Sequence, residues 1–168
     1  MNKIVFKNPW FNILEIQRSE TSDQYFYGVK PKDYVTAAAY DQDGNLLLVS
    51  QYRPIIDQYT LETPGGHVDE CYTPEQAIKI ELKEEIGLTF NSIKLLAILE
   101  PDVGRLMNKL YVFEARLPKN GNLNPEQGIT IEKVQPSEMY KLITNSVITS
   151  AYTISAIYLS MSNYESIK

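Results

Sequence analysis

Residues 65–88 read GGHVDECYTPEQAIKIELKEEIGL, and this stretch constrains the fold more than any other. Thr73 is a suitable N-cap, a proline follows at the first helical position, and Gln76 completes a capping box. Gly87 is placed to end the helix. The stretch therefore predicts a helix over residues 74–86, preceded by a tight glycine turn.

The predicted helix carries two neighbouring stripes of side chains. Successive residues of an α-helix are rotated by about 100°, so their spacing assigns each one to a face. One apolar stripe must face the core, and it consists of Ile78, Leu82 and Ile86. Three glutamates form a second stripe beside it, namely Glu81, Glu84 and Glu85.

The acidic stripe lacks the lysines that a solvated helix face normally supplies. No Lys or Arg stands three or four positions from any of the three glutamates, although such pairs contribute roughly 0.2–0.5 kcal/mol each. A simple solvated face is the competing interpretation, but it leaves like charges opposite one another. Carboxylates without partners indicate a bound cation, and ligation by oxygen alone suits magnesium or manganese. Gly65 adds a backbone carbonyl that can approach the same cation closely.

Composition sets wider limits on the protein. The length of 168 residues favours one domain, and the net charge of -5 argues against non-specific binding to nucleic acid or to an anionic membrane. The single cysteine excludes an intramolecular disulfide, which suits a reducing cytoplasm. We expect a cytoplasmic protein, since the first residues lack a signal-peptide pattern and no apolar run reaches the roughly 20 residues that span a bilayer.

Strands and helices alternate with turns along the rest of the chain. Asp41–Gly44 is a strong hairpin turn because Gly44 supplies the positive φ that such turns require. Expected strands cover residues 4–16, 24–29, 33–40, 45–52, 59–62, 92–100 and 109–116, and expected closing helices cover residues 136–143 and 147–162. This order predicts an α/β fold, more closely an α+β sandwich. We expect a single domain over residues 1–168, with residues 1–32 forming N-terminal strands that serve as an appendage or dimer arm and residues 33–168 forming the core.

The stretch from Gly66 to Leu88 resembles the Nudix box, G-x5-E-x7-R-E-U-x-E-E-x-G-U with U apolar. The positions in register are Gly66, Glu81, Leu82, Glu84, Glu85, Gly87 and Leu88. Tyr72 and Ile80 stand where the family has a Glu and an Arg that are thought to form an ion pair. Both partners have changed together to groups that can pack without charge, and such an exchange can be neutral for stability.

The resemblance extends over roughly residues 33–160, toward the ADP-ribose and nucleotide-sugar pyrophosphatase branch. QYR at residues 51–53 and LETPGG at residues 61–66 match two elements of that branch. The resemblance implies a mixed central sheet between helices and a magnesium or manganese site on Glu81, Glu85 and the Gly65 carbonyl. It also implies catalytic roles for Glu84 and Glu85, and substrate contacts by Arg53, Glu62, Arg105 and Asn108. Asn108 aligns with a loop glutamate of that branch, so the identity of a general base stays open.

The resemblance implies hydrolysis of the diphosphate bond of a nucleoside diphosphate derivative, such as ADP-ribose or a nucleotide sugar. The products are a nucleoside monophosphate and a phosphorylated remainder. The alternative is a binding or regulatory module of the same fold that does not turn its ligand over, and the changes at Tyr72, Ile80 and Asn108 favour it. Against it stand the three glutamates, which a simple binder does not need. We expect a homodimer that acts on a small molecule, without a nucleic-acid or membrane partner.

Overall fold

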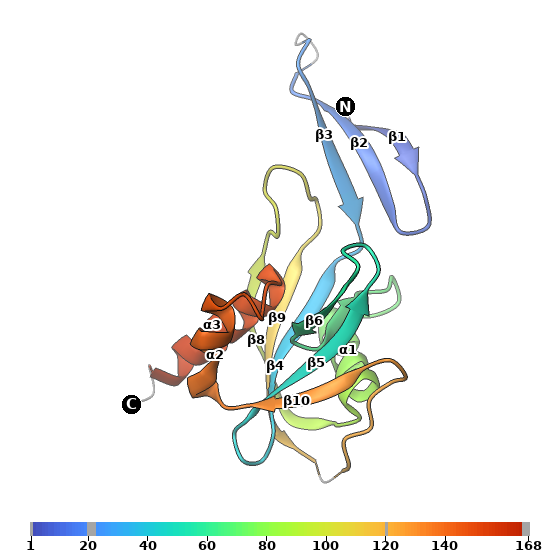
Figure 1. Ribbon diagram of the computed structural model, residues 1–168. Coiled ribbons are helices and arrows are strands. Elements are labelled where there is room, and N and C mark those ends of the chain that lie inside the picture. Colours follow the sequence, from blue (N-terminus) through green and yellow to red (C-terminus); the bar gives the residue numbers. More distant parts are fainter. Residues whose placement is uncertain (1, 20–22, 120, 166–168) are drawn as a thin grey trace.

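A mixed seven-stranded sheet forms the centre of the protein. The computed structural model describes residues 2–19, 23–119 and 121–165 (Figure 1). Along the sheet the order is β10 (Thr130–Val134), β5 (Leu46–Arg53), β4 (Tyr34–Tyr40), β9 (Leu110–Pro118) and β8 (Phe90–Leu99). Two short strands join it: β6 (Gln58–Glu62) pairs with β5, and β7 (Gly65–His67) pairs with β4. The β4–β9 pair is parallel, and the other pairs of this sheet are antiparallel.

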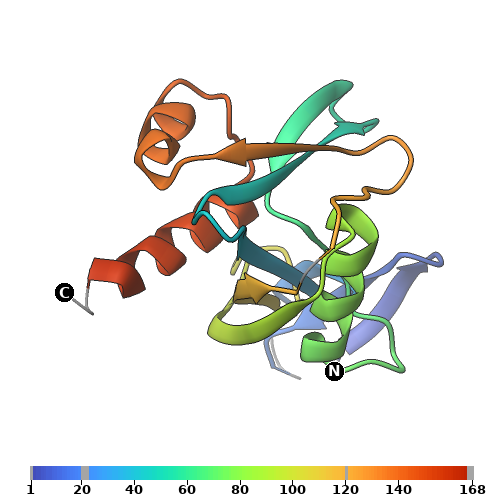
Figure 2. The ribbon, with the colours of Figure 1, turned by 90° about the horizontal axis from the view of Figure 1, so that it is seen from below.

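Helices cover both faces of this sheet (Figure 2). On one face lies α1 (Pro74–Glu81), which continues as the π-helix η1 (Leu82–Ile86). On the other face lie the short 3₁₀ helix η2 (Pro136–Glu138), α2 (Met139–Thr144) and α3 (Ala151–Glu165). A separate apolar cluster packs beneath each layer of helices. The arrangement confirms the predicted α/β sandwich.

The local signals at the acidic helix are confirmed. Thr73 Oγ1 accepts from the backbone N–H of Gln76 at 3.3 Å, and the Gln76 side chain accepts from the backbone N–H of Thr73 at 2.9 Å. Gly87 adopts the left-handed conformation with φ of 82° and ends the helical segment. The apolar stripe is buried as expected, with Ile78, Leu82 and Ile86 at most 1% exposed.

Three strands at the N-terminus form a sheet of their own, which projects from the sandwich (Figure 1). They are β1 (Asn2–Lys7), β2 (Phe11–Gln17) and β3 (Tyr25–Pro31), all antiparallel. The single strand expected over residues 4–16 was wrong. Asn8 breaks it, because its side chain accepts hydrogen bonds at 2.8 Å from the backbone N–H groups of Trp10 and Phe11 and so forms a tight turn. Strands β2 and β3 pair as an antiparallel hairpin, and residues 20–22 between them lie outside the described residues.

The projecting sheet is hydrogen-bonded to the connection between β8 and β9. The N–H of Val29 donates to the carbonyl of Arg105 at 2.8 Å, and the N–H of Met107 donates to the carbonyl of Val29 at 2.9 Å. Gly28 lies against the Met107 side chain. The two parts of the chain therefore share backbone hydrogen bonds as well as the covalent link between β3 and β4.

Three further differences from the expected elements have physical causes. Strand β7 consists of two glycines and a histidine, so propensity does not predict it, and only its pairing with β4 makes it extended. Strand β10 has five residues and depends on its antiparallel pairing with β5. The last helix begins at Ala151 rather than at residue 147. None of the helices in the described part of the chain is long and apolar enough to cross a bilayer.

The burial of Leu82 leads to a prediction about stability. Leu82 is 1% exposed and packs in the cluster between the acidic helix and the sheet. Leu82→Ala should lower the free energy of unfolding by about 2–5 kcal/mol, because it removes buried methyl groups and leaves a cavity. Its neighbour Lys83 is exposed, so Lys83→Ala should change that free energy by no more than about 0.5 kcal/mol. Urea unfolding of the two variants measures both, and equal losses would contradict the packing described.

Candidate active site

The backbone of Gly65 and Gly66 is pressed between β4 and the acidic helix. A Cβ on Gly65 would lie 2.1 Å from the carbonyl oxygen of Val35, and a Cβ on Gly66 would lie 2.0 Å from Oε1 of Glu81. Both distances are far below van der Waals contact, so neither position tolerates a side chain without displacing its neighbours. The two glycines thus bring the peptide backbone directly against the carboxylates.

Glu85 is the most deeply buried of the three glutamates, at 6% exposure. Its Oε2 accepts a hydrogen bond of 2.8 Å from the N–H of Gly65, and its Oε1 accepts one of 3.4 Å from Nε2 of Gln51. Burial raises the pKa of Glu85 to about 7, even though the hydrogen bond from Gly65 and the nearby Arg53 act in the opposite direction. Sequence reasoning did not assign Gln51 a role, and its place in the QYR element was the available signal.

Glu81 lies half-buried against Gly66, in a wholly acidic setting. Burial raises its pKa to about 7, and the charges of Glu84, Glu126 and Asp69 raise it further. Within the described part of the chain, the charges that shift the pKa of Glu81 are thus all acidic. Glu126 belongs to the connection between β9 and β10, and its N–H donates to the Glu84 carbonyl at 3.1 Å. Sequence reasoning missed this carboxylate, because nothing local in the sequence indicates that this connection folds back onto the helix.

The π-helix divides the predicted stripe of three glutamates. Glu85 turns into the core, whereas Glu84 is exposed to solvent. The expectation of one continuous stripe assumed α-helical rotation throughout, and a wider turn from Leu82 to Ile86 changes the angle between successive side chains. Among the described residues there is no group of three or more His, Cys, Asp or Glu side chains arranged to hold a metal ion. The donor set that the chain offers is therefore two carboxylates and a backbone carbonyl.

This donor set fits a hard divalent cation. Glu81 and Glu85 are both held against the glycine turn, and each has a pKa raised by burial, so a cation at this place would stabilise their ionised forms. The carbonyl of Gly65 accepts one hydrogen bond, of 2.9 Å, from the Tyr34 hydroxyl. A carbonyl oxygen has two lone pairs, so one is left for a metal. Oxygen donors without thiolate or imidazole suit magnesium or manganese better than zinc.

Arg53 and Glu62 form a two-pronged ion pair beside this site. Nε of Arg53 donates to Oε1 of Glu62, and Nη2 donates to Oε2, both at 2.8 Å. The pair joins neighbouring strands, since β5 carries the arginine and β6 carries the glutamate. Thr60 adds a third hydrogen bond to Glu62. Arg53 is also close enough to Glu85 to lower its pKa, so the structure brings these two predicted residues together with the glycine turn.

The other two predicted substrate contacts lie on the connection between β8 and β9. Arg105 has a 79% exposed side chain and forms an ion pair of 2.7 Å with Asp102. Asn108 is 5% exposed, and its amide donates to the Lys32 carbonyl at 3.2 Å. Among the described residues, its Oδ1 is the one buried side-chain nitrogen or oxygen atom without a hydrogen-bond partner. Within the described part of the chain, the polar interactions of these two side chains are with Asp102, the Lys32 carbonyl and the Tyr152 hydroxyl, so their predicted contact with a substrate stays a prediction.

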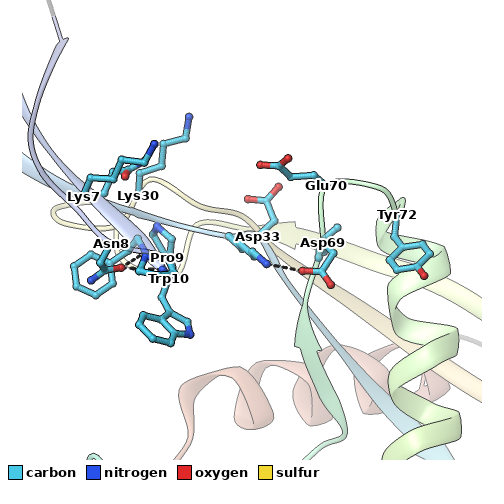
Figure 3. A pocket seen from close by; sticks show the side chains of 14 residues that line it. Lys7, Asn8, Pro9, Trp10, Lys30, Asp33, Asp69, Glu70 and Tyr72 are labelled. Atoms are coloured by element: carbon cyan, nitrogen blue, oxygen red, sulfur yellow. Dashed lines mark hydrogen bonds and ion pairs between the residues drawn. The ribbon is translucent and has the colours of Figure 1, made fainter.

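A cavity of about 570 Å³ opens between the N-terminal sheet and the turn that follows β7 (Figure 3). Lys7 of β1 and Lys30 of β3 line this cavity. Both lie opposite Asn12 in the strand register, one on each side of β2, so the two lysines lie in one row across the sheet. Trp10 is 72% exposed at its edge. On the opposite wall Asp69, which raises the pKa of Glu81, pairs with Lys32 at 2.5 Å. The cavity therefore lies beside the acidic centre.

Residues 30–148 match the NUDIX domain family. The chain belongs to the Nudix family. It is 25% identical over 133 residues to the ADP-ribose pyrophosphatase of Bacillus subtilis, a match that covers 77% of this chain and 72% of that relative. A shorter stretch of 40 residues is 48% identical to the RNA pyrophosphohydrolase of Aliivibrio fischeri and covers 24% of each protein. The crystal structure of an ADP compounds hydrolase superposes with a TM-score of 0.83 at 19% identity, covering 99% of this chain and 92% of that one.

These similarities confirm the family and the fold that the box predicted. The family match spans both the glycine turn and the acidic helix. The protein is a Nudix pyrophosphohydrolase. The structural likeness, at its low identity, supports the fold alone.

The raised pKa values of Glu81 and Glu85 lead to a prediction about pH. Both groups have an ordinary pKa of 4.5 and a folded-state pKa of about 7, so the folded protein holds their protons more tightly than the unfolded chain. Without divalent metal, stability should therefore fall as pH rises from about 4.5 to about 7. Glu85→Gln should flatten this decline and abolish most of the stabilisation by Mn²⁺. Thermal melts at pH 5–8 in EDTA and in Mn²⁺ measure both effects. A pH profile identical to that of the wild type would contradict the assignment.

Proposed function

We propose that this Nudix protein hydrolyses the diphosphate bond of a nucleoside diphosphate derivative, such as ADP-ribose or a nucleotide sugar, with Mg²⁺ or Mn²⁺ as cofactor. The products would be a nucleoside monophosphate and a phosphorylated remainder. One observation carries the proposal. Two carboxylates with raised pKa values, Glu81 and Glu85, are held against a glycine turn where the charged neighbours of Glu81 are all acidic. The similarity to the ADP-ribose pyrophosphatase of Bacillus subtilis supports the class of substrate.

The carbonyl of Gly65 and the carboxylates of Glu81 and Glu85 would hold the cation. When bound, it would neutralise the diphosphate and make a nearby water more acidic. Glu85 keeps its carboxylate oriented through the N–H of Gly65. Glu84 is exposed beside Glu81, so it can accept a proton from an attacking water and release it to solvent. Glu126 is a further candidate for this role, because its charge acts on Glu81 from outside the helix.

Arg53 would bind the phosphates, and Glu62 would hold it in place. The pair with Glu62 uses Nε and Nη2 of the guanidinium, which leaves Nη1 for a phosphate oxygen. The cavity beside Trp10 would accept the part of the substrate beyond the diphosphate. This placement of the substrate is supported by the exposed indole of Trp10 and by Lys7 and Lys30, for which no ion pair is found among the described residues. Arg105 and Asn108 would approach the substrate only if the connection that carries them moves.

The alternative function is a binding module that does not turn its ligand over. The changes at Tyr72, Ile80 and Asn108 are its support in the sequence. Against it, a module of this kind has no use for the ionisation of two buried glutamates. We also propose that the protein acts on a small molecule in the cytoplasm. The net charge of -5 disfavours a nucleic-acid or membrane partner, and the exposed free thiol of Cys71 suits a reducing compartment.

We further propose a homodimer formed through the N-terminal sheet. Both faces of this sheet carry large apolar side chains that the described part of the chain leaves exposed, and such surfaces are usually covered by a partner. The exposed large apolar residues of the three strands and their first turn are Ile4, Val5, Phe6, Trp10, Tyr25, Phe26 and Tyr27.

An activity measurement tests the proposed reaction. ADP-ribose and a set of nucleotide sugars are incubated with Mg²⁺, and phosphate is measured after treatment of the products with a phosphatase. Arg53→Lys keeps the charge but loses the two-pronged geometry. We expect this variant to raise KM about tenfold, which corresponds to about 1.4 kcal/mol, with a smaller change in kcat. Arg116→Lys is the matched control, because Arg116 lies on β9 and pairs with Glu114 rather than with Glu62. The absence of turnover of every substrate by the wild type would rule the proposal out.

The oligomeric state tests the dimer. Sedimentation of the wild type should give the mass of two chains. Phe26→Lys should shift the protein to a monomer, because it places a charge on the sheet that the partner is proposed to cover. Tyr158→Lys introduces the same charge at an exposed position of α3 and should leave the mass unchanged. A wild type that sediments as one chain at all concentrations would exclude this interface.

A further inference from the structure

Tyr34, which the sequence analysis did not single out, occupies the point where three strands meet beside the glycine turn. It is the first residue of β4 and pairs with His67 of β7 on one side and with Leu110 of β9 on the other. Its backbone N–H donates to the carbonyl of Lys109 at 2.9 Å. The backbone of Tyr34 is therefore paired with a strand on each side. This pairing fixes the direction in which its side chain leaves the sheet.

The ring of Tyr34 is held by two other aromatic side chains. His67 meets it edge-on, with 5.3 Å between the ring centroids and an angle of 81°. Tyr152 of α3 packs against it at 5.3 Å and 60°. These contacts involve the rings alone, so they would persist in a phenylalanine at the same position.

The hydroxyl of Tyr34 links both halves of the site. It donates to the carbonyl of Gly65 at 2.9 Å, and burial raises its pKa, so it remains a protonated donor at neutral pH. The Arg53 guanidinium also interacts with this hydroxyl, lowering the pKa of Tyr34 while its own is raised. The charges of Glu85 and Glu62 act on the same oxygen. One hydroxyl thus lies among the proposed metal-binding carbonyl, the proposed phosphate-binding arginine and a proposed metal-binding carboxylate.

The glycine turn does not need this hydroxyl to keep its place. Thr36 and Thr63 share a hydrogen bond of 2.7 Å between their buried hydroxyls, and the N–H of Thr63 donates to Oγ1 of Thr153 at 3.1 Å. The ladder between β4 and β7 adds backbone pairing. Because these contacts already fix the turn, the hydrogen bond from Tyr34 is left to set the orientation of a single carbonyl.

We propose that Tyr34 is a positioning residue of the metal and phosphate site. Its hydroxyl occupies one lone pair of the Gly65 carbonyl and so directs the other toward the cation held by Glu81 and Glu85. The same oxygen faces the Arg53 guanidinium and holds it toward the phosphates. The inference rests on the proposed function and deepens it, since it names the group that keeps the metal-binding carbonyl and the arginine in a common orientation.

The test is Tyr34→Phe, which keeps the ring contacts and removes the hydroxyl. Calorimetric titration with Mn²⁺ alone should show a Kd raised roughly three- to tenfold, the range expected for the loss of one hydrogen bond. KM for the best substrate should rise by a similar factor, with a smaller change in kcat. The melting temperature in EDTA should stay within a few degrees of the wild type.

The matched control is Tyr152→Phe. Its ring packs against the same neighbour, but its hydroxyl interacts with Asn108 and not with Gly65, so Mn²⁺ affinity should be unchanged. An equal loss of affinity in both variants would assign the effect to packing and overturn the inference. Failure of Tyr34→Phe to fold, or wild-type Mn²⁺ affinity and KM in that variant, would overturn it as well. A wild type that binds no Mn²⁺ would overturn the proposed function together with the inference. The outcomes above, in which the wild type does bind Mn²⁺, would overturn the inference alone.

Discussion

The close approach of the Gly65–Gly66 backbone to the acidic helix is the constraint on which the rest of the structure depends. A single missing Cβ at each position lets the chain pass between β4 and Glu81 at distances that no other residue type permits. That passage places the N–H of Gly65 on Glu85 and its carbonyl on the other side, toward Tyr34. The two peptide groups that flank the Cα of Gly65 therefore connect the acidic helix to β4. The arrangement of Glu85 and Tyr34 around the site follows from where Gly65 lies.

The cost of this arrangement is electrostatic. Glu81 and Glu85 are withdrawn from water in the company of further acidic groups, and their raised pKa values measure how unfavourable ionisation is there. The surrounding apolar cluster makes such a site possible, because the same helix buries Ile78, Leu82 and Ile86 on its adjacent face. Packing on one face thus holds in place a charge distribution that would not form on a free helix. A bound divalent cation would relieve this repulsion, so the proposed metal binding would be coupled to stability.

The features that could be predicted from the sequence are those encoded over a few residues. The capping box at Thr73, the turn at Gly44 and the apolar stripe of the helix each depend on local spacing, and the structure has all three. Features that depend on distant partners could not be predicted. Strand β7 exists because β4 pairs with it, and Glu126 reaches the site along a connection with no local signal. Within the π-helical turn Glu85 is buried whereas Glu84 is exposed. For the candidate site, the sequence indicated the carboxylates and Arg53 but not the hydroxyl that lies between them, because a tyrosine at the start of a strand resembles any core aromatic.

The parallel pairing of β4 with β9 has a consequence for the order in which the protein assembles. Strand β4 has almost no exposed surface, yet its neighbour on one edge is synthesised long after it, once the acidic helix and β8 have already been made. Contacts between residues so far apart in the chain close slowly, because loop-closure entropy must be overcome before they form. A nascent chain that stops before β9 exposes the unpaired edge of an alanine-rich apolar strand, and such edges recruit other strands. Until β9 has been synthesised, this edge of β4 therefore remains open to pairing with other chains.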